Sequence, residues 1–111
     1  MSKPLALLFT GFSWVNNFEH ESLAFVLADA GNDVWLANTR GNLYSRAHTS
    51  LAPTDRRFWL WSFDEIAALD LPAYFDLVLT RTNQSKLNYV GHSQVCRVWC
   101  RVFYSKVCYE P

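Results

Sequence analysis

A serine near the carboxyl end of the chain stands in a pattern that could support nucleophilic catalysis. Residues 91–95 read Gly-His-Ser-Gln-Val, which keeps the first glycine of a Gly-x-Ser-x-Gly pattern and has Val95 in place of the second. In that pattern a tight turn between a strand and a helix needs small neighbours, so that the serine hydroxyl stands clear of the sheet. Ser93 is therefore a candidate nucleophile, although many strands simply end in a serine.

A serine hydroxyl also needs a base. The sequence has three histidines, and all of them precede Ser93 (His20, His48 and His92). Where the nucleophile stands on such a turn, the acid and then the histidine of the triad follow the serine in the chain. Residues 94–111 contain no histidine, and Glu110 is their only carboxylate side chain. We therefore expect that these 111 residues cannot assemble the triad in its usual order, which would leave Ser93 a poor nucleophile.

The end of the chain differs in composition from the rest. Residues 1–94 carry 7 basic and 9 acidic side chains and no cysteine, whereas residues 95–111 carry 3 basic side chains, 1 acidic side chain and all three cysteines. This distribution does not fit a disulfide framework. The cysteines together with His92 match no usual zinc spacing, so we expect neither a metal site nor a cofactor.

Length and composition limit the possible partners. The 111 residues suit one small domain, and 50% hydrophobic and 16% aromatic residues are enough for a core. The formal net charge is zero, which gives no sign of a nucleic-acid partner. Arg56 and Arg57 precede an aromatic stretch that could stack on bases, but we favour a surface loop there. No apolar run reaches the roughly 18 residues of a transmembrane segment.

The first half of the chain alternates between strand and helix character. Residues 5–9 form a continuous apolar run, which suits a strand covered on both faces. A segment with apolar residues at helical spacing follows, and we expect Asn16 or Asn17 to cap this helix and Gly31 to end it. Residues 33–39 then predict a second buried strand, closed by Gly41.

The second half contains a long connection and an interrupted helix. The connection, residues 41–61, has the length of a functional or partly structured loop. Ser62 followed by Glu65 predicts a capping box at the start of a helix. Pro72 lies within this helix, and because proline removes a hydrogen bond and clashes with the preceding turn, we expect two helical pieces that meet near Asp70.

Residues 86–93 predict a third strand that leads directly to the candidate serine. The resulting order is strand, helix, strand, helix, strand, with short links. Such an order favours parallel strands joined by right-handed crossovers. The sequence therefore predicts a fold of the α/β class.

Three strings of the sequence resemble the acid lipase family of α/β hydrolases, which includes gastric and lysosomal acid lipases and plant triacylglycerol lipases. They are SLAFVLADAGNDVWLANTRGNLYSRAHTSLAP, FWLWSFDEIAALDLPAYFDLVLTRT and LNYVGHSQ. The resemblance runs from about residue 7 to residue 94. It implies a partial α/β-hydrolase domain over residues 1–94, with three parallel strands and crossover helices, and a non-homologous tail over residues 95–111.

The resemblance also implies an activity and roles for individual residues. Members of the family are serine ester hydrolases that act on acylglycerols or steryl esters. By the resemblance Ser93 is the nucleophile, Gln94 supplies a backbone N–H to the oxyanion hole, and Gly91 and His92 form the turn before the serine. The family takes its second oxyanion donor from a His-Gly pair after the first strand. The stretch LLFTGFSW lacks that pair, and two alternatives follow: the pair was cut off upstream, or FTG replaces it.

Three interpretations follow. The first is an ester hydrolase by descent that is inactive as this isolated chain, because the family's domain stops after the candidate serine. The second is a non-catalytic fragment that binds apolar lipid or a cognate lipase through open sheet edges and aromatic surfaces. The third is a mis-spliced or frameshifted product without a selected function.

One further motif concerns modification and location. Asn83, Gln84 and Ser85 form an N-glycosylation sequon, which is consistent with the secreted, lysosomal or vacuolar destinations of the family. The first residues have a short apolar stretch but no convincing signal-peptide cleavage site, so the sequence does not fix a location.

Overall fold

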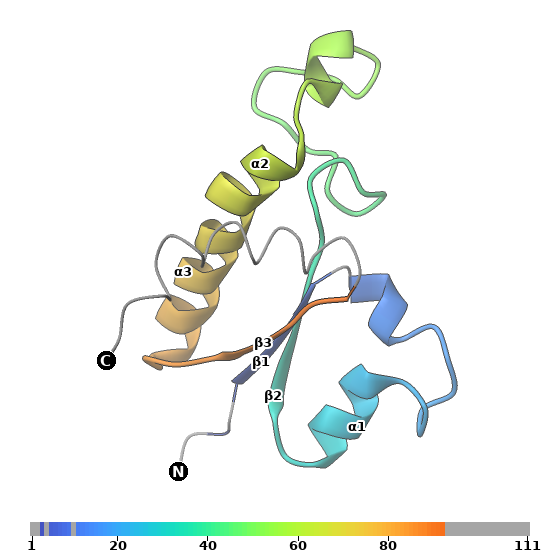
Figure 1. The fold of residues 1–111 in the computed structure, drawn as a ribbon, viewed down its shortest axis with the longest axis vertical. Helices are drawn as coiled ribbons and strands as arrows, with labels where there is room; N and C mark the ends of the chain where they lie inside the picture. Colours follow the sequence, from blue (N-terminus) through green and yellow to red (C-terminus); the bar gives the residue numbers. More distant parts are fainter. Residues whose placement is uncertain (1–2, 4, 10, 93–111) are drawn as a thin grey trace.

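The structure is a computed structural model, and it describes residue 3, residues 5–9 and residues 11–92. Three strands form one parallel sheet: β1 (Leu5–Phe9), β2 (Asp33–Ala37) and β3 (Asn88–Val90). Their order is β2-β1-β3, so the first strand lies in the middle (Figure 1). The prediction of an α/β fold with three parallel strands is confirmed.

Two strands are shorter than the sequence predicted. In place of residues 33–39, β2 ends at Ala37, because the next residues form a turn in which the side-chain amide of Asn42 bonds to that of Asn38 at 3.0 Å. In place of residues 86–93, β3 comprises three residues, which pair with Ala6, Leu7 and Leu8 of β1. The predicted end of this strand, residue 93, lies outside the described residues.

The connection from β1 to β2 contains a 3-10 turn, η1 (Gly11–Trp14), and the helix α1 (Leu23–Asp29). The prediction that Asn16 or Asn17 caps this helix is wrong, because the N-cap position is occupied by Ser22. The buried Ser22 hydroxyl donates to the carbonyl oxygen of Asn17 at 3.0 Å and accepts from its N–H at 3.2 Å. Gly31 follows the helix with φ +88°, which confirms the predicted left-handed end.

The long connection between β2 and the second helical segment is folded against itself. It contains one 3-10 turn, η2 (Arg56–Trp59), and the indole N–H of Trp59 donates to the carbonyl oxygen of Pro53 at 2.7 Å. Gly41 has φ +80° and lies against the rings of Trp59 and Trp61. Its position requires both a left-handed backbone and the absence of a Cβ atom, because a Cβ would overlap the rings.

The second helical segment has three parts. A short helix, α2 (Phe63–Glu65), leads into a π-helical turn, η3 (Ile66–Asp70), and then into α3 (Leu71–Thr82). The capping box of Ser62 and Glu65 is present, as predicted. Pro72 lies in the first turn of α3, so the predicted break near Asp70 is confirmed and takes the form of a wide turn.

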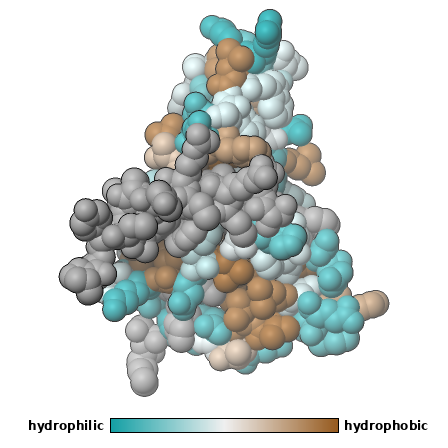
Figure 2. Space-filling view, viewed as in Figure 1, coloured by the Kyte–Doolittle hydropathy of each residue, from teal (hydrophilic) through white to brown (hydrophobic). Residues whose placement is uncertain are grey.

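The core lies between the sheet and the second helical segment. Side chains of β1 and β2 meet those of the π turn and α3, and all of them are buried: Leu7, Ala37, Ile66, Ala67, Leu71 and Val78. On the other side of the sheet α1 gives only partial cover (Figure 1), so Leu36 of β2 is 43% exposed. Figure 2 has the same view as Figure 1, and it shows an apolar surface patch over β2 and α1.

No helix among the described residues is both long and apolar enough to cross a lipid bilayer.

Candidate active site

The candidate serine follows the carboxyl end of a strand in a parallel sheet. Because β1, β2 and β3 are parallel, their carboxyl ends lie at the same edge, and this is where open α/β sheets bind ligands. Gly91 and His92 come directly after β3 at this edge. Ser93 and Gln94 lie outside the described residues, so their roles stay predictions.

The turn after β1 contacts the residue before the serine. The indole of Trp14 meets the imidazole of His92 edge-on, with ring centroids 6.4 Å apart and an angle of 86° between the planes. Trp14 is the last residue of η1, the turn that follows β1. The fold therefore brings this turn beside His92, the residue before the candidate serine.

The strand that leads to the serine is held by α3. The ring of Tyr89 meets that of Phe75 edge-on at a centroid distance of 5.7 Å, and both side chains pack against the core. Aromatic pairs in this arrangement stabilise a fold by about 0.5–1.5 kcal/mol beyond their burial. The position of β3, and hence of Gly91, is thus set by packing on one face of the sheet.

The side chain of His48 forms hydrogen bonds within its own loop. Its Nδ1 atom accepts hydrogen bonds from the backbone N–H groups of Ser50 at 3.1 Å and Leu51 at 3.0 Å. A general base takes a proton on a free ring nitrogen, and a proton on Nδ1 would break both bonds. The ring also meets Phe58 edge-on at 6.0 Å. This geometry favours a structural role for His48.

His20 lies on the surface with its side chain 81% exposed. It stacks on Phe18 at a centroid distance of 6.2 Å and approaches the carboxylate of Glu21 at 3.8 Å. A pair this exposed contributes little to stability and offers no desolvated base.

The structure reveals an ion pair that sequence reasoning missed. Arg40, three residues after β2, donates from Nε to both carboxylate oxygens of Asp70 at 2.9 and 3.1 Å, and from Nη2 to Oδ1 at 2.5 Å. Its backbone N–H also donates to Oδ2 at 3.3 Å. The side-chain hydrogen bonds to Asp70 raise the pKa of the Arg40 guanidinium. An arginine just after a strand and an aspartate just before Leu-Pro were the available signals, but their pairing depends on the fold.

A second link joins the same two elements. The hydroxyl of Tyr74, one turn into α3, donates to the carbonyl oxygen of Asn38 at 2.8 Å. The chain beyond β2 is therefore tied to the start of α3 at two places. No group of three or more His, Cys, Asp or Glu side chains that could hold a metal ion occurs within the described ranges, and the three cysteines lie outside them.

Comparison with known proteins decides the family. Residues 4–103 match a family model described as the alpha/beta hydrolase fold. The chain is 50% identical to gastric triacylglycerol lipase of Mus musculus over 97 residues, which are 83% of this chain and 25% of that protein. The chain belongs to the acid lipase family of α/β hydrolases.

Two further relatives are similar in sequence to this acid lipase chain over a comparable length. It is 51% identical to lipase member N of Homo sapiens over 80 residues, which are 72% of the chain and 20% of that protein. It is 49% identical to lysosomal acid lipase/cholesteryl ester hydrolase of Rattus norvegicus over 86 residues, 78% of the chain and 22% of that protein. The chain thus spans at most a quarter of the length of these relatives. The domain boundary at residue 94 stays a prediction.

Proposed function

We propose that this chain carries the nucleophile segment of a serine ester hydrolase that acts on acylglycerols or steryl esters. In this proposal Ser93 attacks the ester carbonyl and the backbone N–H of Gln94 donates to the resulting oxyanion. The substrate class follows from the names of the relatives, which are a triacylglycerol lipase and a cholesteryl ester hydrolase.

One observation carries the proposal: identity near 50% over a segment whose β3 ends one residue before Gly91, at the carboxyl edge of the sheet. The contact between Trp14 and His92 supports it, because an oxyanion hole needs donors from two turns that lie side by side. Backbone N–H groups of η1 are the candidates for the second donor. They would replace the donor that the family takes after its His-Gly pair.

We further propose that the 111 residues alone do not turn over esters. A serine hydroxyl attacks an ester only when an imidazole removes its proton, and this imidazole must itself be oriented by a carboxylate. The Nδ1 atom of His48 is occupied, and His20 is an exposed surface residue. Residues 94–111 supply no further histidine.

The test has two arms. In the first, the purified chain is treated with a fluorophosphonate and with a short-chain ester, and we expect neither labelling nor turnover. In the second, residues 7–94 replace the matching segment of mouse gastric triacylglycerol lipase. The chimera should hydrolyse tributyrin, and Ser93→Ala should abolish the activity and the labelling, whereas Ser85→Ala should retain both. An active Ser93→Ala chimera would overturn the assignment of the nucleophile.

A second candidate function rests on the exposed apolar side chains. Phe25 and Val26 of α1 are 39% and 43% exposed, and Leu36 is as exposed as Val26 although parallel strands are normally covered on both faces. A fragment that binds acyl chains without cleaving them would use such a surface (Figure 2). Saturable binding of a fluorescent fatty acid, weakened by Leu36→Ser and unaffected by Ser93→Ala, would favour this candidate.

A further inference from the structure

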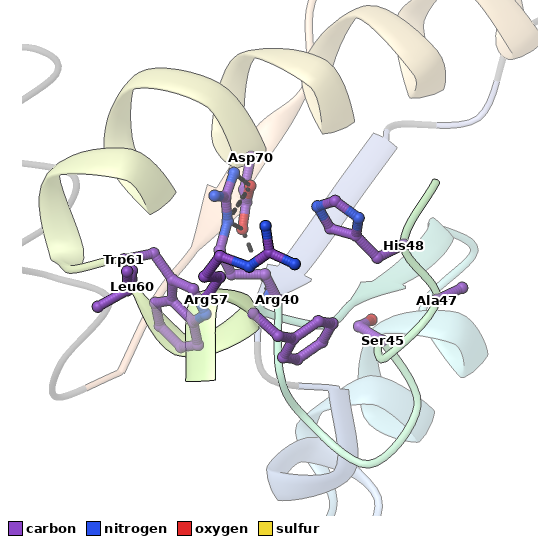
Figure 3. Close-up of a pocket in the computed structure, with 9 residues that line it drawn as sticks. Arg40, Ser45, Ala47, His48, Arg57, Leu60, Trp61 and Asp70 are labelled. Atoms are coloured by element: carbon purple, nitrogen blue, oxygen red, sulfur yellow. Dashed lines mark hydrogen bonds and ion pairs between the residues drawn. The ribbon is translucent and has the colours of Figure 1, made fainter. Parts of the chain in front are cut away.

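A cavity lies beside the Arg40–Asp70 ion pair, away from the candidate serine turn in sequence. Its volume is about 360 Å³, which is at the lower end of the range for small-molecule sites. The loop after β2 supplies Arg40, Ser45 and His48, and the segment around η2 supplies Arg57. Figure 3 shows these side chains gathered around the hollow beside Asp70.

The acceptors of this cavity are already occupied. Asp70 is the only carboxylate among the described residues that line it, and each of its oxygens accepts two hydrogen bonds from Arg40. The Nδ1 atom of His48 accepts from two backbone N–H groups. A ligand that needs acceptors from the protein would therefore find few here.

The donors, by contrast, are in surplus. Arg40 uses Nε and Nη2 toward Asp70, and Arg57 uses the same two atoms toward Asp55, so within the described part of the chain the Nη1 atom of each guanidinium has no hydrogen-bond partner. Because Nδ1 of His48 accepts, the neutral ring carries its proton on Nε2. The hydroxyl of Ser45 likewise makes no hydrogen bond to another described residue.

The remaining wall is apolar and partly aromatic. Phe58 is 8% exposed and lies on this wall with Leu60 and Trp61. Flat rings beside arginine guanidinium groups suit a ligand with a flat apolar portion. Charge-assisted hydrogen bonds from arginine suit an oxyanion, and arginine commonly binds carboxylate or phosphate through two such bonds.

We propose that this cavity binds a small organic oxyanion, a carboxylate or a phosphate monoester, whose flat apolar portion lies against Phe58 and Trp61. The oxygens of the ligand accept hydrogen bonds from the Nη1 atoms of Arg40 and Arg57, from Nε2–H of His48 and from the Ser45 hydroxyl. The site takes no part in ester hydrolysis and is independent of the function proposed for Ser93.

The test is a titration of the isotopically labelled chain with benzoate, phenyl phosphate, inorganic phosphate and the neutral benzamide, followed by NMR at constant ionic strength. Benzoate and phenyl phosphate should produce saturable shifts of the Ser45, His48 and Arg57 amides and of the Trp61 indole. Tighter binding of phenyl phosphate would assign the site to phosphate monoesters, and tighter binding of benzoate to carboxylates. Benzamide and inorganic phosphate should bind at least about tenfold more weakly, since each lacks one half of the recognised group.

Variants separate a site from general charge attraction. Arg57→Gln should weaken binding by about tenfold, the value expected for one charge-assisted hydrogen bond. The matched control is Arg56→Gln, which removes the same charge from the neighbouring exposed residue outside the cavity and should change affinity less than about twofold. Ser45→Ala tests the site without any change of charge and should weaken binding a few-fold. Equal losses in Arg56→Gln and Arg57→Gln, equal binding of benzamide and benzoate, or shifts that do not saturate would overturn the proposal.

Discussion

The carboxylate of Asp70 is held through both of its oxygens by Arg40, a residue 30 positions earlier in the chain. The Asp70 side chain is only 13% exposed and that of Arg40 is 32% exposed, so the pair lies partly out of water. Arg40→Gln should therefore lower the free energy of unfolding by about 2 kcal/mol, the range for hydrogen bonds to a charged group. Urea denaturation followed by circular dichroism measures this change.

The matched control is Arg57→Gln, which breaks the pair with Asp55. The Arg57 side chain is 72% exposed, and such surface pairs contribute little. Equal losses of stability in the two variants would contradict the assignment of Arg40 and Asp70 as the link between β2 and α3.

Gly41 should tolerate no side chain. A Cβ atom there would lie 2.6 Å from a ring carbon of Trp61 and 2.9 Å from one of Trp59, and the backbone has φ +80°. Gly41→Ala should cost about 1–2 kcal/mol for the left-handed backbone and about 1–3 kcal/mol more for the displaced rings. Gly31→Ala provides the comparison, because Gly31 has φ +88° but no atom within 4 Å of the added Cβ. Similar unfolding free energies for the two variants would show that the rings yield freely.

The capping box should make stability depend on pH. Hydrogen bonds from the hydroxyl and then the backbone N–H of Ser62 lower the pKa of Glu65 from its ordinary value of 4.5. A group with a lowered folded-state pKa stabilises the fold above its unfolded pKa, and this contribution is lost as the pH falls through the folded pKa. The stability difference between the wild type and Glu65→Gln should therefore be constant near neutral pH and shrink below about pH 4.5. A difference that does not change between pH 7 and pH 3 would rule out this origin.

The contact between Trp14 and His92 should be visible by NMR. The imidazole lies edge-on to the indole at 6.4 Å, so Trp14→Leu should change the ring-current shift of the His92 Hε1 signal. Trp59→Leu is the control, because Trp59 packs on Phe58 and Trp61 in the loop that follows β2. An unchanged His92 signal in Trp14→Leu would separate η1 from the candidate serine turn.

Asn83 should carry an N-glycan when the chain enters the secretory route, which is a prediction from its sequon. The residue is exposed at the left-handed end of α3, with φ 52°. Expression behind a signal peptide should give a band that a peptide N-glycosidase shifts to lower mass. Ser85→Ala should remove the shift while it leaves the backbone conformation of Asn83 in place. A band of unchanged mobility in the wild type would contradict the prediction.

The elements that follow local rules could be predicted from the sequence. The apolar run at residues 5–9, the left-handed glycine at 31, and the capping box of Ser62 and Glu65 all depend on neighbouring residues only. The cap of α1 was predicted wrongly because two asparagines precede the helix, and the choice of Ser22 depends on a turn that its buried hydroxyl closes.

The sequence predicts which residues belong to the candidate site, but it does not predict which residues lie beside one another in space. Family resemblance marks Ser93 and the residues around it, but no periodicity pairs Arg40 with Asp70 or sets Trp14 against His92. Both contacts join turns that follow different strands or helices, so they exist only after the sheet has formed. The donor-rich cavity beside the ion pair has the same origin.

The wide turn at Ile66–Asp70 constrains how this segment can vary between related proteins. Each residue of an α-helix advances the side chains by about 100°, so a regular α-helix over these residues would turn Ile66 about 140° away from the direction in which Leu71 is buried, whereas the wider turn brings both side chains to the same side. Substitutions of similar size leave that geometry intact. Loss of one residue would also be tolerated, because it turns the segment into a regular helix with the same buried face, so homologous chains that lack the wide turn should be one residue shorter at this place.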